Sequence, residues 1–132
     1  MIFHYQEISP QIIRPIVPIV LKARNKFAVN LALIDSGADR CIFDIEIAKA
    51  LSIKLRPNKI SLKGIGRDKV VGNLGEIELN INGISYDLIA IFAPMEEFDH
   101  GILGQKGFFD HFDIRLNYRN KIIEIKKLPE VN

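Results

Sequence analysis

Short runs of apolar residues, separated by polar residues, glycine or proline, dominate the chain and predict β-strands rather than long helices. Residues 16–23 and 27–33 flank the polar triplet RNK and predict a hairpin. Alternating residues on either side of Asn82-Gly83 predict a second hairpin, because Asn-Gly favours a tight two-residue turn. The run at 88–92 is wholly apolar, which indicates a strand buried on both faces.

Glycine turns and short helical patterns interrupt these strands. Asp44 is suited to cap a helix over residues 45–51. The segment HGILGQKGFFDHF, which starts at residue 100, predicts a glycine turn followed by a second short helix. Two further strands are predicted at 113–118 and 121–127. We therefore expect a mainly β protein with one or two short helices.

A faint internal repeat links the two glycine turns. The order of hairpin, buried strand, glycine turn and short helix occurs over residues 16–51 and again over residues 77–112. The first turn reads IDSGA and the second reads GILGQ. This arrangement predicts that the two turns pack against each other at the centre of a closed β-barrel.

Composition narrows the class of protein. The chain has 132 residues, the size of one ordinary domain, so residues 1–132 are expected to form a single domain. Hydrophobic residues make up 48% and charged residues 26%, which is typical of a globular chain. The net charge is only +2 and the Lys and Arg residues are scattered, so a nucleic-acid-binding surface is not indicated.

Cysteine content and hydropathy favour a cytoplasmic location. Cys41 is the single cysteine, so the chain forms no internal disulfide, which agrees with a reducing compartment. The first residues, MIFHYQEISPQ, lack the charged-then-apolar pattern of a secretory signal. The longest apolar run, LIAIFAPM, is far shorter than the roughly 18 residues that a membrane helix needs, so no membrane partner is expected.

Other residues with reactive or metal-binding side chains are interpreted as structural or surface residues. His4, His100 and His111 match no established metal-ligand spacing, and neither a metal nor another cofactor is expected. Cys41 is followed by Ile and Phe, which favours a buried thiol over a nucleophile. Ser36 lacks the G-x-S-x-G elbow, and the glycines of GIGRDKVVG lack the Lys-Ser/Thr pair of a phosphate-binding loop.

The stretch ALIDSGAD places Asp35 and Ser36 where an apolar strand gives way to a glycine turn. Taken alone, it favours an ordinary Asx- or Ser-initiated turn. Two such carboxylates about 3 Å apart would repel by roughly 5 kcal/mol at an effective dielectric near 20, so one acid and one base would coexist. Because the chain has one Asp-Ser-Gly turn, such a pair requires a two-fold dimer.

LIDSGAD together with GILGQKGFF resembles the retropepsin-like aspartic proteases, and GIGRD falls where that family has a glycine-rich flap. The resemblance covers residues 16–112 in the family's order. It implies a closed retropepsin-like (acid protease) β-barrel and an aspartic endopeptidase that hydrolyses peptide bonds as a homodimer. The partners it implies are a second copy of the chain and a peptide or protein substrate.

The resemblance also assigns roles to individual residues. Asp35 resembles the catalytic aspartate, Ser36 the hydroxyl that bonds across the dimer axis, and Gly37 the residue that tightens the turn beside the dyad. Ala38 and Asp39 are expected to contact the substrate backbone. The remaining assignments are the flap tip, Gly64, Ile65 and Gly66, and the support of the catalytic loop, Ile102, Leu103 and Gly104.

Two departures from the family pattern leave a second hypothesis open. Retroviral members follow the supporting glycine with an Arg that pairs with the second Asp of their motif. Gln105 occupies that position here, so Asp39 lacks its usual partner unless Arg40 replaces it. Residues 113–127 also continue the chain in a region where retroviral chain ends join the dimer. The alternative is a non-catalytic retropepsin-like barrel that binds peptides or partner proteins; a metal-binding barrel built on the Asp-His pairs ranks below both.

Overall fold

The computed structural model describes residues 1–62, 70–95, 98 and 100–130. Its elements are twelve strands and one helix, in an order that agrees with the expectation of a mainly β chain. The strands are β1 (Ile2–His4), β2 (Gln6–Ser9), β3 (Ile12–Arg14), β4 (Ile16–Ala23), β5 (Lys26–Ile34), β6 (Ile42–Asp44), β7 (Lys59–Leu62), β8 (Val70–Ile81), β9 (Ile84–Ala93), β10 (Gly101–Leu103), β11 (Phe112–Asn117) and β12 (Ile122–Lys127), and the helix is α1 (Ile45–Ala50).

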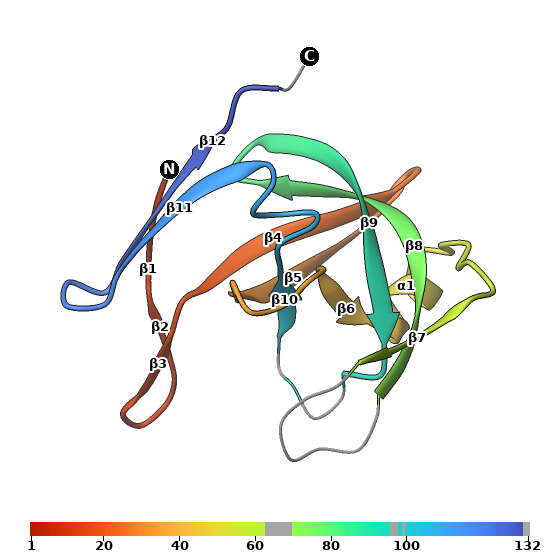
Figure 1. The fold of residues 1–132 in the computed structure, drawn as a ribbon, viewed down its shortest axis with the longest axis horizontal. Coiled ribbons are helices and arrows are strands. Elements are labelled where there is room, and N and C mark those ends of the chain that lie inside the picture. The colour runs from red at the N-terminus through yellow and green to blue at the C-terminus, as the bar shows by residue number, and fades with distance from the viewer. Residues whose placement is uncertain (63–69, 96–97, 99, 131–132) are drawn as a thin grey trace.

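The central sheet closes on itself to form a barrel (Figure 1). Its strands are hydrogen-bonded in the order β4-β5-β10-β6-β9-β8, and β8 pairs back onto β4 through Leu79 and Leu21. β7 extends the sheet from the other end of β8. The predicted closed β-barrel is therefore confirmed.

Alternation along the strands fills the barrel. In β8, Ile77, Leu79 and Ile81 are 3% exposed or less, and they alternate with more exposed polar residues. β8 continues into β9 through Asn82 and Gly83, which both adopt positive φ values, 49° and 89°. The Asn-Gly hairpin is confirmed, since this backbone geometry is the one that a tight hairpin turn requires.

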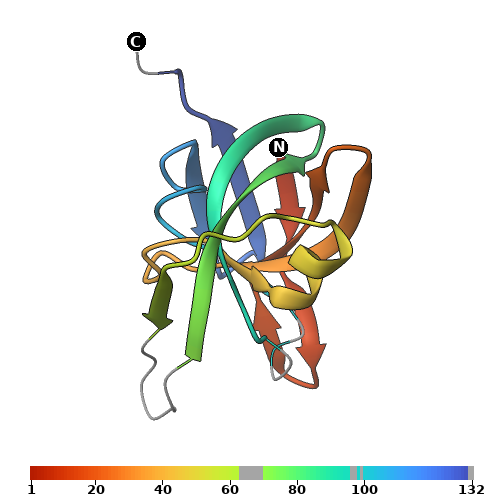
Figure 2. The ribbon, with the colours of Figure 1, turned by 90° about the vertical axis from the view of Figure 1, so that its right-hand side faces the viewer.

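The two ends of the chain form a second, three-stranded sheet. β1 pairs antiparallel with β12, and β12 pairs with β11, so the N-terminal strand runs alongside the C-terminal hairpin (Figure 1 and Figure 2). The Met1 ammonium group donates a hydrogen bond of 2.8 Å to the carbonyl of Ile125. β11 and β12 were predicted from their alternation, whereas β1 and the β2–β3 hairpin were not. These N-terminal strands are only three or four residues long, too short to show a clear period.

The first predicted helix is confirmed and the second is wrong. The Asp44 carboxylate caps α1 by accepting a hydrogen bond of 3.2 Å from the backbone N–H of Glu46. Residues 105–111 instead form turns, interrupted by a β-bridge between Lys106 and Arg40, with Gly107 at a φ of 102°. That backbone conformation lies outside the helical region, so the residues that follow Gly104 cannot continue a regular helix.

Two sequence expectations remain untested by the fold. The flap tip, Gly64 to Gly66, lies outside the described residues. Among the described residues, no helix combines the length and the apolar character that crossing a membrane requires.

Candidate active site

The DSGAD stretch forms the loop that joins β5 to β6. Asp35 directly follows the last residue of β5, and its backbone N–H donates a hydrogen bond of 3.0 Å to the carbonyl of Leu103. The carboxylate of Asp35 accepts a hydrogen bond of 2.9 Å from the backbone N–H of Gly37. Asp35 is half-buried, whereas Ser36 and Gly37 are exposed. The turn therefore fixes the carboxylate at the surface with one side open to solvent.

The predicted contact between the two glycine turns is confirmed. β10 runs parallel to β5, with Leu103 opposite Ile34, so both strands end at the same edge of the sheet. Beyond that edge, the backbone N–H of Gln105 donates to the carbonyl of Ala38 at 2.8 Å, and that of Lys106 donates to Asp39 at 2.9 Å. The loop that carries Asp35 is thus attached by backbone hydrogen bonds to the chain that follows β10.

Gly104 allows this close approach. A Cβ atom at residue 104 would lie 2.4 Å from the carbonyl oxygen of Arg40 and 2.7 Å from that of Ala38, both of them backbone atoms. No L-residue with a side chain fits at those distances unless the two backbones move apart. Leu103 is fully buried and Ile102 is partly buried on the same strand.

Gln105 contributes a contact that the sequence did not reveal. Its side-chain N–H donates a hydrogen bond of 2.8 Å to the backbone carbonyl of Ser36. Within the described part of the chain, Asp39 forms no ion pair, with Arg40 or with any other residue. A neutral amide therefore connects the two turns at the position where the family pattern has an arginine.

Buried Cys41 and partly buried Tyr86 lie next to the chain that follows β10. Cys41 is 0% exposed, and burial raises the pKa of its thiol to about 12, with the Asp110 carboxylate adding to the shift and a hydrogen bond with the Gly104 backbone opposing it. The hydroxyl of Tyr86 donates a hydrogen bond of 2.6 Å to the carbonyl of Gly107. Burial, followed by the nearby Cys41 and Asp110, also raises the pKa of Tyr86 well above its usual value. Cys41 is a structural thiol, as the sequence indicated.

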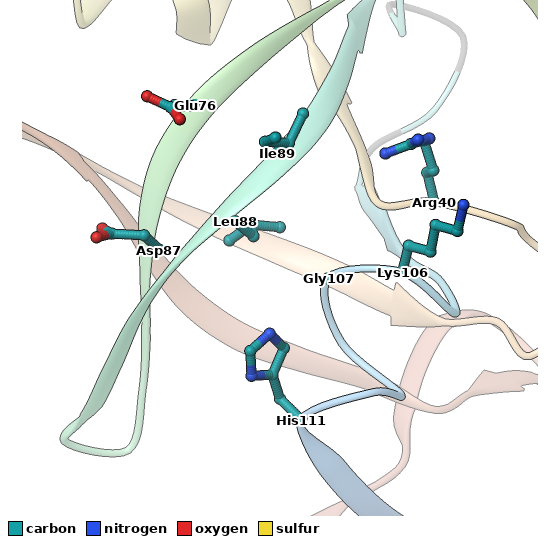
Figure 3. Close-up of a pocket in the computed structure, with 8 residues that line it drawn as sticks. All are labelled: Arg40, Glu76, Asp87, Leu88, Ile89, Lys106, Gly107 and His111. Carbon is teal, nitrogen blue, oxygen red and sulfur yellow. The ribbon is translucent and has the colours of Figure 1, made fainter. Parts of the chain in front are cut away.

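A pocket of about 360 Å³ lies on the barrel side of this loop (Figure 3). Arg40, Lys106 and His111 line one part of it, and Leu88 and Ile89 form an apolar part. The full lining is Arg40, Glu76, Asp87, Leu88, Ile89, Lys106, Gly107 and His111, which does not include Asp35 or Ser36. The half-buried carboxylate of Asp35 therefore lies outside this pocket.

The histidines have local contacts. The His100 ring lies 2.9 Å from the carbonyl of Gly101, and the His111 ring stacks on Tyr86 with centroids 4.3 Å apart. Among the described residues, no three His, Cys, Asp or Glu side chains are grouped so that they could hold a metal ion.

Comparison with known proteins assigns the family. Residues 24–106, well over half of the chain, match the family model described as aspartyl protease, so the chain belongs to the aspartyl protease family. This segment contains the DSGAD loop, β10 and Gly104. No curated protein sequence matches the chain.

Solved structures with a similar fold are retroviral or retroviral-like. The retroviral protease-like domain of Ddi1 from Leishmania major is 16% identical with a TM-score of 0.57, over 88% of this chain and 94% of that domain. EIAV protease in complex with the inhibitor HBY-793 is 21% identical with a TM-score of 0.47, over 70% of this chain and 82% of that protease. The likeness to the Ddi1 domain, together with the family match, confirms the retropepsin-like fold.

We predict that Gly104→Ala separates the two turns. The new methyl group would collide with backbone carbonyls, so we expect a loss of about 2 kcal/mol or more in the free energy of unfolding, measured in urea. We also expect the amide NMR signals of Ser36 and Gly37 to shift. Gly83→Ala is the matched control, because its Cβ meets nothing within 4 Å and its cost of about 1–2 kcal/mol arises from the positive φ alone. Unchanged loop signals in Gly104→Ala would contradict this account.

We predict that stability declines at alkaline pH because of Cys41 and Tyr86. Both groups bind their protons more tightly in the folded chain than in the unfolded chain, so their contribution is complete below about pH 9 and is lost as the pH rises toward 12. Urea unfolding across this range measures the slope. Tyr86→Phe removes one titrating group, so its decline should be shallower than that of the wild type, although its stability at neutral pH is lower. Parallel curves for the two proteins would refute the assignment.

Proposed function

We propose that the chain is an aspartic endopeptidase that acts as a homodimer, with Asp35 of each chain at the two-fold axis. The observation that carries the proposal is the position of Asp35. In a segment that matches the aspartyl protease family, its half-buried carboxylate ends a barrel strand and is held by the Gly37 amide. A glycine turn that holds one carboxylate open to solvent suits pairing with a second copy.

The paired carboxylates would divide the roles of acid and base. At a separation of about 3 Å their repulsion is roughly 5 kcal/mol, so the pair retains one proton. The ionised carboxylate takes a proton from water as the water oxygen attacks the peptide carbonyl carbon, and the protonated carboxyl hydrogen-bonds to the carbonyl oxygen. The tetrahedral intermediate then expels the amine, which receives a proton from the pair. Each turnover consumes one water molecule and leaves the pair with its single proton.

The other residues of the loop have supporting roles in this proposal. The exposed hydroxyl of Ser36 would bond across the dimer axis, and Gly37 keeps the turn tight beside the carboxylate. Ala38 and Asp39 would contact the substrate backbone. Leu103 and Gly104 hold the loop in place, and Gln105 fixes the Ser36 carbonyl. Gly64 to Gly66 would cover the substrate as a flap.

The pairing of the terminal strands limits which surfaces can form the proposed dimer. β12 pairs with both β1 and β11 of the same chain, so this C-terminal strand has no free edge for a partner chain. Dimer contacts would therefore come mainly from the DSGAD loops and the surface around them. The same observation favours the second candidate, a monomeric barrel of residues 1–132 that binds peptides without cleaving them. Sedimentation equilibrium separates the two candidates, because a chain that stays monomeric at high micromolar concentration cannot form the pair.

We predict that Asp35→Asn abolishes peptide cleavage while the fold is retained. Because the amide neither ionises nor accepts a proton, the rate should fall by about a thousandfold or more. The measurement is cleavage of a mixed peptide library from acidic to neutral pH, at protein concentrations that populate a dimer. Wild-type activity should rise with the square of the concentration while the monomer predominates.

The control is Asp39→Asn in the same loop. Asp39 is exposed and forms no ion pair in the described part of the chain, so this change leaves the proposed pair intact and should affect substrate affinity more than turnover. Cleavage that survives Asp35→Asn would refute the proposed function. Cleavage by neither the wild type nor the variant, from folded samples, would favour the binding barrel.

A further inference from the structure

The outer face of the β4–β5 hairpin is an exposed apolar surface. Phe27, Val29 and Leu31, on β5, are 68%, 70% and 40% exposed. Cross-strand pairing places Val20 opposite Val29 and Pro18 opposite Leu31 on the same face. We call these five residues the hairpin face. Exposed apolar side chains are common one at a time, but a contiguous set on adjacent strands is typical of a binding surface.

The tip of the hairpin, at one end of the hairpin face, is basic. No Asp or Glu occurs between residues 8 and 34, while Lys22, Arg24 and Lys26 lie at the hairpin tip. Glu78 of β8 lies opposite Lys22, and Lys26 lies on the other face of β5 from Phe27, where its ammonium group donates to Ser52. The excess positive charge at this end therefore comes chiefly from Arg24. An apolar surface with a basic end is complementary to an apolar segment with acidic neighbours.

The hairpin face and the proposed catalytic group lie on one strand. Side chains of a β-strand alternate between its two faces, so Phe27, Val29, Leu31 and Leu33 share a face that leads to Asp35 at the strand end. At about 3.3 Å per residue, Val29 is roughly 20 Å from Asp35. An extended polypeptide that reaches from Asp35 to Val29 therefore spans about six residues.

The free edge of β5 favours a polypeptide as the occupant. β10 pairs only with residues 32–34 of β5, so among the described strands residues 26–31 pair with β4 alone. Backbone groups on the other side of this segment are available to an added strand, which would gain main-chain hydrogen bonds as well as side-chain contacts. A lipid headgroup would use the charges of this surface but not this edge.

We propose that the hairpin face is an exosite that binds an extended segment of the substrate, composed of apolar residues flanked by Asp or Glu, about six residues from the bond to be cleaved. The inference rests on the proposed function for its role in catalysis. Binding of the segment to the hairpin face does not require peptide cleavage, so it is measured with a protein that lacks the catalytic carboxylate. The exosite would select long, acidic, partly unfolded polypeptides over short peptides.

The test uses the full-length Asp35→Asn protein and a fluorescein-labelled peptide, Glu-Glu-Leu-Phe-Leu-Glu-Glu. Fluorescence anisotropy measures its affinity. We expect Phe27→Thr with Val29→Thr to weaken binding by about tenfold, since threonine suits a β-strand but replaces apolar surface with a polar group. Arg24→Gln should weaken binding about threefold and reduce its dependence on salt.

Matched controls isolate the hairpin face. Leu116→Thr on β11 removes an apolar side chain of similar exposure, 45%, outside the hairpin face and should leave the affinity unchanged. Peptides with a Ser-Ser-Ser centre or with Lys flanks should bind at least tenfold more weakly. In the active wild-type background, the Phe27→Thr, Val29→Thr change should raise KM for a long substrate that carries the acidic apolar segment, with little change for a short one.

Three results would overturn the exosite. The first is peptide affinity that is equal in the hairpin variant and its parent. The second is hairpin-dependent binding to phosphatidylglycerol vesicles without peptide binding, which would identify a membrane surface. The third is concentration-dependent self-association that is lost in the hairpin variant, which would identify a contact between copies of the chain. If the hairpin variant binds the peptide as its parent does but the wild type still cleaves the library, the exosite is refuted and the proposed function stands. If the peptide binds at the hairpin face but the wild type cleaves nothing, the proposed function is refuted and the binding surface stands.

Discussion

The arrangement of the candidate site depends on one backbone contact, the approach of Gly104 to the carbonyls of Ala38 and Arg40. β10 can run between β5 and β6 and still pass beneath the DSGAD loop only because residue 104 has no Cβ atom. The hydrogen bonds from the amides of Gln105 and Lys106 then become geometrically available. The position of the Asp35 carboxylate is thus set by main-chain atoms more than by its own side-chain contacts.

Gln105 changes the electrostatic character of this support. An arginine at this position would pair with Asp39 through charge, and salt would screen that pair. The Gln105 amide instead donates to the Ser36 carbonyl, an interaction with little dependence on salt or pH. The exposed carboxylate of Asp39 is left to interact with other groups. The loop therefore retains its attachment while Asp39 is released from the structural role that the family pattern implies.

Sequence patterns predicted the parts of the fold that arise from local rules. Apolar runs on either side of the RNK turn gave β4 and β5, and alternation around Asn82-Gly83 gave β8, β9 and the turn between them. Asp44 gave the cap of α1. The parallel pairing of β10 with β5 was anticipated only as contact between two glycine turns, because register between distant segments is not encoded locally. The prediction of a second helix was wrong because Gly107 adopts a positive φ. The hydrogen bond from the Gln105 side chain to the Ser36 carbonyl was missed because nothing in the sequence indicates the partner of a neutral side chain in a loop.

The terminal sheet bears directly on how a catalytic pair would form. β12 is paired on both sides within one chain, by β1 and β11, and the Met1 ammonium group is bonded to Ile125. Two protomers that meet at the Asp35 loops would form few new backbone hydrogen bonds through a strand that is already paired. The dimer interface would then be smaller than one in which the chain ends of both protomers form a shared sheet. A smaller interface implies weaker association, because a given protein must bury enough surface to offset the entropy lost on dimerisation. Activity of such an enzyme would be governed by local concentration, and a substrate-binding surface on each chain would favour the dimer whenever one long polypeptide contacts both protomers.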